Sequence, residues 1–207
     1  MPPLTGTVAL AYPFTGRWLV GNSPANRVPS HGTSLFATTH AIDFVPVDPR
    51  MRSAPITLRT LVGTEPPELF VGFGLPILAP VAGTVVAVHD GEPDHDAFRG
   101  LSSVGYALTQ RGRASQGWAA LAGNHVMIEV EVGVVDAVCH LRRGSLLVVT
   151  GQQLRAGSPL GRCGNSGNST EPHVHLQAMT HPDPDRAAGL PISFPDGLPR
   201  NGTVVTL

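Results

Sequence analysis

The pattern of apolar and polar positions divides much of the chain into short extended segments that end at glycine-containing turns. Side chains in a strand point alternately to opposite faces, so an apolar residue at every second position indicates a strand with one buried face. The predicted strands cover residues 39–46, 124–130, 134–141, 145–149 and 159–163, together with a strand, turn and strand at 76–91. Many short strands at near-regular spacing predict an all-β fold built mostly from antiparallel sheets.

The segments between these strands have weaker patterns. Residues 1–39 are irregular, with short extended pieces at 8–11 and 17–20, and prolines interrupt residues 50–70. We expect a partly helical insertion at about 93–122 and a proline-rich tail at 183–207 with at most one short strand, at 204–206. The length predicts a single domain over residues 1–207, with its core at about 30–180.

The composition excludes several classes of function. The 207 residues carry a formal net charge of −1, so no basic surface points to nucleic acid or to anionic lipid. No segment approaches the roughly 20 apolar residues of a membrane span. Residues 1–20 lack a basic start and contain three prolines, which is unlike a signal peptide. We therefore expect either a cytoplasmic protein or a chain whose leader has been removed.

The cysteines and the basic residues narrow the chemistry further. Cys139 and Cys163 lie in apolar runs, and two cysteines do not make a disulfide framework, so we interpret both as small buried side chains. All 14 basic residues are arginines. Any function that attaches a cofactor to lysine is therefore excluded.

A His-x-His pair is the clearest candidate for chemistry. The flexible loop 164–170 ends at a Glu-Pro pair, and the chain then enters an extended segment that carries His173 and His175 on one face. Such a pair suits a metal site or an acid–base site, although a solvated polar face is the simpler interpretation of the pair alone. Asp43 lies between two apolar residues of another predicted strand, where a carboxylate needs a cation, hydrogen bonds or a metal opposite it.

Glycine-rich and histidine-containing motifs also follow one another in a specific order along the predicted core. In chain order they are Ala79-Pro80-Val81-Ala82-Gly83-Thr84-Val85, Gly123-Asn124-His125-Val126, Cys139-His140-Leu141 with Gly144-Ser145, Gly151-Gln152, Gly157, Leu160-Gly161, Gly164-Asn165-Ser166-Gly167-Asn168-Ser169 and Pro172-His173-Val174-His175. Together they resemble the lysostaphin-like (LytM-like) zinc metallopeptidases of the peptidoglycan endopeptidase type, over roughly residues 30–179. The resemblance implies a groove or barrel-sandwich of the duplicated hybrid motif type, with long loop insertions, and one bound Zn²⁺.

The resemblance also assigns residues to roles. Asp43 and His175 become zinc ligands, and three protein ligands leave one tetrahedral position for water. Zinc lowers the pKa of that water, so that a hydroxide attacks an amide carbonyl. His140 and His173 become catalytic residues that do not bind the metal. We assign His140 as the general base and His173 as the group that steadies the developing oxyanion, although these roles are interchangeable.

The first histidine ligand is where the chain departs from the family's commonest pattern, His-x-Gly-x-Asp. His40 stands three residues before Asp43, which on a regular strand puts the two on opposite faces unless a bulge intervenes. His31, in a Ser-His-Gly turn, is free of this constraint, and some members of the family carry their first histidine on such a turn. We therefore predict His31 as the ligand, with His40 as the alternative.

Three classes of function remain after these assignments. The first is a zinc-dependent endopeptidase acting on peptidoglycan stem or cross-bridge peptides, which would work in the cell envelope or outside the cell. The second is a metal-binding or regulatory module of the same fold that binds or activates cell-wall hydrolases. The third is a carrier domain. The missing lysine excludes biotinyl and lipoyl carriers, and Asp43 disfavours a phosphotransferase IIA-like carrier.

Overall fold

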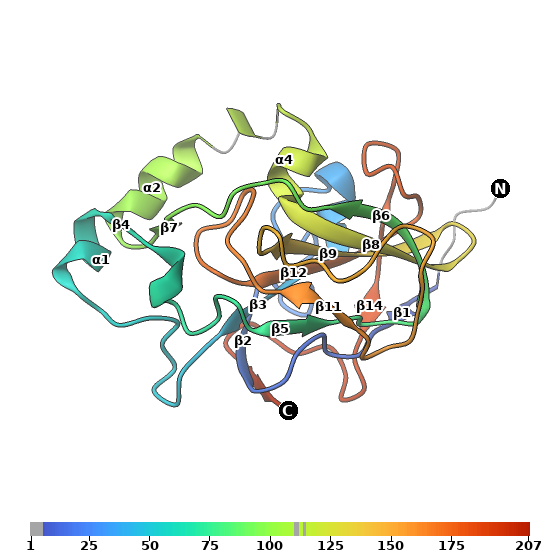
Figure 1. Ribbon diagram of the computed structural model, residues 1–207, viewed down its shortest axis with the longest axis horizontal. Coiled ribbons are helices and arrows are strands. Elements are labelled where there is room, and N and C mark those ends of the chain that lie inside the picture. Colours follow the sequence, from blue (N-terminus) through green and yellow to red (C-terminus); the bar gives the residue numbers. More distant parts are fainter. Residues whose placement is uncertain (1–5, 110–111, 114) are drawn as a thin grey trace.

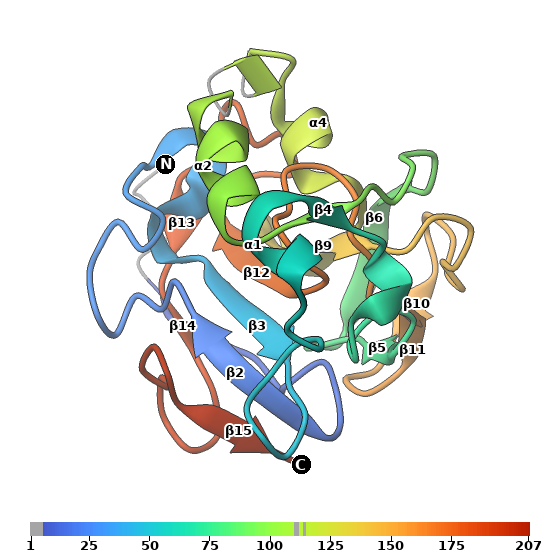
Figure 2. The same ribbon diagram turned by 90° about the vertical axis from the view of Figure 1, so that its left-hand side faces the viewer.

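The strand pattern forms one large antiparallel sheet, seen in the computed structural model of the chain (Figures 1 and 2), which describes residues 6–109, 112–113 and 115–207. The first five residues of the N-terminal segment and residues 110–111 and 114 of the insertion lie outside the described residues. In spatial order, the strands of this sheet are β10 (Gln153–Leu154), β6 (Gly83–His89), β8 (Asn124–Glu131), β9 (Val134–Leu141), β12 (Val174–Met179), β3 (Ile42–Pro46), β2 (Arg17–Gly21) and β15 (Val204–Thr206). A short strand, β13 (Gly189–Leu190), also pairs with β12.

Three two-stranded sheets accompany the large one. They are β5 (Pro76–Leu78) with β11 (Pro159–Arg162), β4 (Thr64–Glu65) with β7 (Ala97–Phe98), and β1 (Val8–Ala9) with β14 (Ile192–Ser193). The pair β1 and β14 is parallel, whereas the other two pairs are antiparallel. The predicted all-β, mostly antiparallel fold is confirmed.

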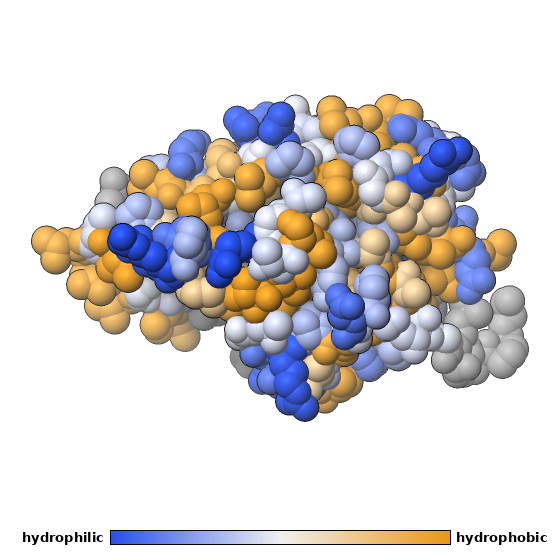
Figure 3. All heavy atoms as spheres, turned by 90° about the horizontal axis from the view of Figure 1, so that it is seen from below, coloured by the Kyte–Doolittle hydropathy of each residue, from blue (hydrophilic) through white to orange (hydrophobic). Residues whose placement is uncertain are grey.

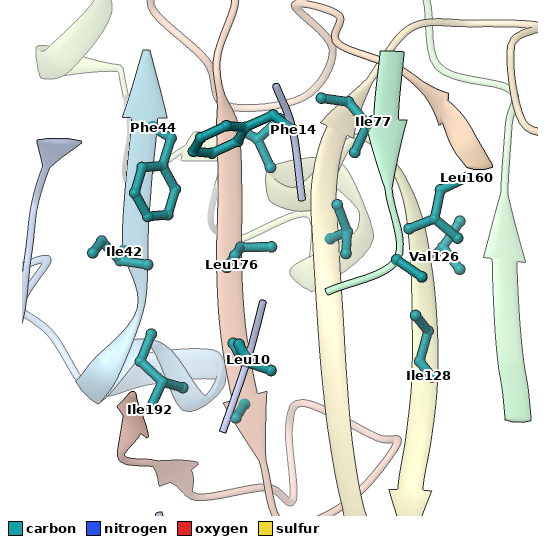
Figure 4. Close-up of a cluster of buried hydrophobic side chains, with 14 of the residues drawn as sticks. Leu10, Phe14, Ile42, Phe44, Ile77, Val126, Ile128, Leu160, Leu176 and Ile192 are labelled. Carbon is teal, nitrogen blue, oxygen red and sulfur yellow. The ribbon is translucent and has the colours of Figure 1, made fainter. Parts of the chain in front are cut away.

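The main hydrophobic core packs against one face of the central strands. Phe44 of β3 and Leu176 of β12 point to this face, where they meet Phe14 and Leu10 from the N-terminal segment and Ile77 of β5 (Figure 4). All five side chains are buried, and burying an aliphatic or aromatic side chain contributes about 1.5–3 kcal/mol. Because side chains alternate, this core fixes which residues of β3 and β12 face the opposite side, where polar residues lie.

The predicted insertion is partly helical. It holds β7, α2 (Leu101–Leu108) and α4 (Trp118–Ala122), and α2 contacts α1 (Leu58–Val62), which belongs to the 50–70 segment. Apolar side chains are exposed on these helices, with Leu58 84% and Leu108 80% exposed. The helices lie at the left-hand end of the molecule in Figure 1, and orange atoms are among those at that end in Figure 3. Within the part of the chain that the structure describes, no helix combines the length and apolar character needed to cross a membrane.

The structure corrects three of the predicted elements. Residues 145–149 do not form a strand, and the structure instead gives an irregular connection. The strand expected at 39–46 begins only at Ile42, because His40 ends a 3₁₀ helix, η1 (Leu35–His40). The tail at 183–207 contains three short strands, β13, β14 and β15, of which only β15 was expected. Pro191 separates β13 from β14, so neither two-residue strand shows as a pattern of alternating side chains.

Candidate metal centre

Strand register brings Asp43 and His175 together. In the antiparallel pair β3 and β12 these two residues stand directly opposite each other, on the face away from the main core. The His175 Nδ1 atom lies 2.9 Å from the Asp43 Oδ1 atom. Residues directly opposite in such a pair have their Cβ atoms about 5 Å apart, so the register itself sets this approach.

His31 reaches the same carboxylate from a turn. The turn is held by a hydrogen bond from the Ser30 backbone amide to the Thr39 carbonyl oxygen, 3.0 Å long. The His31 Nε2 atom then lies 3.1 Å from the Asp43 Oδ2 atom. One potential ligand atom from each of His31, Asp43 and His175 lies within 4.8 Å of the other two. His40 is not in this group.

In His31 and His175 one ring nitrogen, the inner one, lies near Asp43, and the other, the outer one, is within hydrogen-bond distance of a neighbouring side chain. The Nδ1 atom of His31 lies 3.0 Å from Ser30 Oγ, and that hydroxyl donates to the Thr38 carbonyl oxygen at 3.2 Å. The Nε2 atom of His175 lies 3.0 Å from Gln177 Oε1. An N–H at each outer nitrogen leaves a lone pair on the inner one, the arrangement that a histidine ligand needs.

The donor set fits a zinc ion. Two imidazole nitrogens and one carboxylate oxygen are zinc ligands in many proteins, and three such ligands leave a fourth tetrahedral position open. The side chains of His175 and Asp43 are buried and that of His31 is partly exposed, so the group is reached from one side. Asp43 also accepts a hydrogen bond from Asn22 Nδ2 at 2.7 Å.

The Asp43 carboxylate is held in its charged form. Burial alone would raise its pKa. The charge of His31, hydrogen bonds that His175 and His31 donate when their inner nitrogens carry a proton, and the charge of His173 outweigh burial and keep the pKa well below its ordinary value. An ionised carboxylate is the form that binds a metal.

The two further histidines lie beside this group. The ring centroids of His140 and His173 are 4.6 Å apart, and His140 is 5.8 Å from the ring of His175. The Nδ1 atoms are again held by main-chain oxygens, Ser166 for His140 at 2.9 Å and Glu171 for His173 at 2.8 Å. The Nε2 atom of each ring is therefore the one that can exchange a proton, and that of His173 lies 3.8 Å from the Asp43 Oδ1 atom.

His140 owes its direction to a break in its strand. Its φ angle is +62°, in the left-handed region that side chains other than glycine rarely occupy. Cys139 and His140 are neighbours on β9 and would face opposite sides of a regular strand, yet both line the same groove. Such backbone strain gathers at functional sites. Burial and the charges of His173 and His175 lower the pKa of His140 well below its ordinary value, so its ring is neutral.

The groove around these residues has a volume of about 590 Å³, within the range of small-molecule and peptide sites. The other histidines do not line it. His125 packs against Trp118, and burial lowers its pKa to about 4, while His95 is held by main-chain oxygens of Asp96 and Gly167. Cys139 and Cys163 are free and buried, as predicted.

Four residues of the site were missed from the sequence. Gln177 follows His173 and His175 at the same two-residue spacing, so the strand pattern alone would have placed it on their face. Ser30 could have been found as the neighbour of His31. Asn22 and Arg113, which also line the groove, carry no signal in the sequence that ties them to it.

Part of the chain is similar in sequence to known proteins. Residues 109–186 match the model of peptidase family M23. That match covers less than half of the chain, so the chain is similar to this family over these residues. Over 99 residues, 48% of the chain, it is 27% identical to glycyl-glycine endopeptidase ALE-1 from Staphylococcus capitis. The match spans 27% of the length of that relative, so the chain covers about a quarter of it.

Solved structures of related proteins give weaker likenesses. The catalytic domain of the M23 protein EnpA from Enterococcus faecalis is 19% identical, with a TM-score of 0.42 and coverage of 73% of each chain. The catalytic domain of lysostaphin from Staphylococcus simulans is 16% identical, with a TM-score of 0.42, and the alignment covers 84% of this chain and 88% of that one. At these identities and TM-scores the two structures support no inference about the function of this chain.

The M23 match includes His140, His173 and His175 but not His31 or Asp43. Proteins of this family are zinc metallopeptidases. Because His31 and Asp43 lie outside the matched residues, their positions beside His175 are an observation independent of the match. The assignment of His31, Asp43 and His175 as metal ligands, and of His140 and His173 as catalytic residues, stays a prediction that experiment has to test.

Proposed function

We propose that the protein is a zinc-dependent endopeptidase that hydrolyses a peptide bond in peptidoglycan stem or cross-bridge peptides. The observation that carries the proposal is the convergence of His31, Asp43 and His175 on one point, beside two further histidines that line the same groove. When bound there, zinc supplies a Lewis acid that lowers the pKa of a water molecule and polarises a carbonyl group.

The chain's own residues would divide the remaining work. His140 is neutral and its Nε2 lone pair is free, which suits a general base that takes a proton from the attacking water. His173 donates its Nδ1–H to the Glu171 carbonyl oxygen, so it would steady negative charge on the substrate's carbonyl oxygen only as an imidazolium, through a second N–H at Nε2. The roles are interchangeable on present grounds, since both rings line the groove.

The substrate class is proposed from the relative that the chain resembles. Its name describes a glycyl-glycine endopeptidase, and the groove of about 590 Å³ beside the candidate metal centre is open to a peptide. Peptidoglycan as substrate would place the protein in the cell envelope or outside the cell. A regulatory module of the same fold is the second class of function, but nothing in the site favours it, because the ligand group is complete.

The proposal is tested by incubating the purified protein with purified peptidoglycan and following the released fragments by chromatography, with and without added zinc. We expect cleavage that a chelator abolishes and zinc restores. His140→Ala should keep its zinc, because His140 is not in the ligand group, but should lose most activity. A typical general base contributes about 10²–10⁴-fold to the rate. Stoichiometric zinc without cleavage of peptidoglycan or pentaglycine would contradict the proposal.

A further inference from the structure

One cation lies in the wall of the groove beside the metal centre. Arg113 lines the same groove as His31, Asp43 and His175, and it is the only arginine among the described residues that do so. It follows α2 and precedes α4, so it belongs to the insertion. In Figure 2 these two helices lie next to each other above β9 and β12.

The Arg113 side chain is fixed in place. Its guanidinium carbon lies 3.6 Å from the centre of the Tyr106 ring, within the range of a cation–π contact. Its Nε–H donates to Asn168 Oδ1 at 2.7 Å, and its two terminal nitrogens donate to Thr109 Oγ1 and to the Tyr106 carbonyl oxygen. These bonds use three of the five N–H groups of a guanidinium, so two donors remain for a ligand.

The positive charge of Arg113 has no negative partner within the described part of the chain, because all three of its acceptors are neutral. Two other arginines differ in this respect, since Arg99 forms an ion pair with Glu65 at 2.7 Å and Arg52 pairs with Asp48 at 3.1 Å. A fixed guanidinium with free donors suits a carboxylate, whose two oxygens match its geometry.

The anchoring of Arg113 also links it to the loop before the catalytic histidines. Asn168 belongs to the loop that leads to His173, and the Tyr106 hydroxyl donates to the Gly167 carbonyl oxygen at 3.2 Å. A carboxylate bound at Arg113 would therefore lie in the same groove as the bond to be cut.

We propose that Arg113 is a specificity-determining residue that binds a carboxylate of the substrate peptide. The inference rests on the proposed peptidase function for the nature of the ligand. A carboxylate site at Arg113 would favour stem peptides over oligoglycine cross-bridges. Stem peptides contain acidic residues with free carboxylates, whereas the interior residues of an oligoglycine bridge carry none. The carboxylate would take the two unused donors of the guanidinium.

Binding to the metal-free protein tests the proposal without any need for cleavage. The probes are two synthetic stem peptides of identical sequence, one with free side-chain and terminal carboxylates and one with these groups amidated. Removing the metal prevents direct coordination of the carboxylate by zinc. Titration calorimetry should show that the chain binds the acidic peptide about 10- to 100-fold more tightly, as charge-assisted hydrogen bonds predict.

Three variants attribute the preference to one side chain. Arg113→Gln should remove it, and Arg113→Lys should keep part of it, because lysine retains the charge but not the planar fork. Arg142→Gln is the matched control, since Arg142 also lies over an aromatic ring, Phe73 at 5.0 Å, but does not line the groove. Circular dichroism melts of each variant establish that the fold persists, and the lysine variant gives a result even if the glutamine variant unfolds.

The outcomes separate this proposal from the proposed function. The role of Arg113 would be overturned if the unchanged chain bound the acidic and amidated peptides equally. It would also be overturned if Arg113→Gln kept the preference for the acidic peptide, or if Arg113→Lys showed it undiminished. Cleavage of both peptides at equal rates would also overturn it while leaving the peptidase function standing. A preference that Arg113→Gln removes, in a protein that cleaves neither peptide, would support the carboxylate site and contradict the peptidase function.

Discussion

A buried carboxyl group outside the site makes the stability of this fold depend on pH. Asp136, in the middle of β9, is fully buried and faces Ala178 of β12 and Ile128 of β8 across the sheet. Its neighbours two positions away, Val134 and Val138, point into the main hydrophobic core. Among the described residues neither of its oxygens has a hydrogen-bond partner. Burial raises the pKa of Asp136 from 3.8 to about 8.

The sign and size of the effect follow from proton linkage. Between pH 3.8 and about pH 8 the folded chain holds a proton on Asp136 that the unfolded chain has released, so the free energy of unfolding falls as the pH rises. Each pH unit in this window lowers it by about 1.4 kcal/mol. From about pH 5 to about pH 7 the loss from this one group is therefore about 3 kcal/mol.

Replacement by asparagine isolates the effect. Asp136→Asn keeps the size and polarity of the side chain but does not titrate, while all other groups are shared by the two proteins. Urea unfolding of both metal-free proteins, followed by the fluorescence of the buried Trp18 and Trp118, gives the two free energies at each pH. The advantage of the variant over the unchanged chain should grow by about 3 kcal/mol from about pH 5 to about pH 7. Parallel pH dependences would show that Asp136 is ionised in the folded protein and refute the reasoning.

Three further predictions concern the site and its supporting loop. Ser30→Ala removes the hydroxyl that orients the His31 ring, and equilibrium dialysis should show zinc affinity lower by about 10- to 100-fold; an unchanged affinity would contradict that role. Both cysteines are buried with pKa values that burial raises, so neither thiol should react with a disulfide reagent before unfolding, and fast labelling of the native chain would contradict their packing. Gly167→Ala would place a Cβ 2.4 Å from the Gly123 backbone nitrogen at φ +73°, and should destabilise the fold by more than ~2 kcal/mol in thermal unfolding. Gly151→Ala, at φ +89° with open space around the new Cβ, is its control and should cost only about 1 kcal/mol, so equal losses would refute the clash.

The parts of the fold that the sequence predicted are those set by local pattern. The hairpin of β8 and β9 has alternating apolar residues and Gly133 at its turn, where φ is +81°, so both strands and their connection could be recognised. The same approach failed at residues 145–149, where a run of apolar residues looks like a strand. Leu147 and Val149 are exposed there, and the segment makes one backbone hydrogen bond to β11, from the Leu147 N–H to the Leu160 carbonyl oxygen, without forming a strand. Whether a segment finds a partner depends on tertiary contacts that a local pattern does not contain.

The site was predictable where its residues share a strand face or a motif. His175 and Asp43 were named from their surroundings, but that they stand opposite each other depends on the register of β12 against β3. The doubt about His40 assumed that it lies on a strand with Asp43, whereas it ends η1. Asp136 was overlooked although it shows the signal that identified Asp43, an acid between apolar residues of a strand.

The proposed metal centre depends most directly on the identity of the first histidine ligand. The decisive measurement is the zinc content of purified His31→Ala and His40→Ala by mass spectrometry, beside the unchanged protein. Because His31 Nε2 lies 3.1 Å from the Asp43 carboxylate, whereas His40 is outside the group, we predict that His31→Ala loses its zinc and that His40→Ala keeps one ion per chain. Zinc retained at full content by His31→Ala, or lost from His40→Ala, would contradict the metal centre described above.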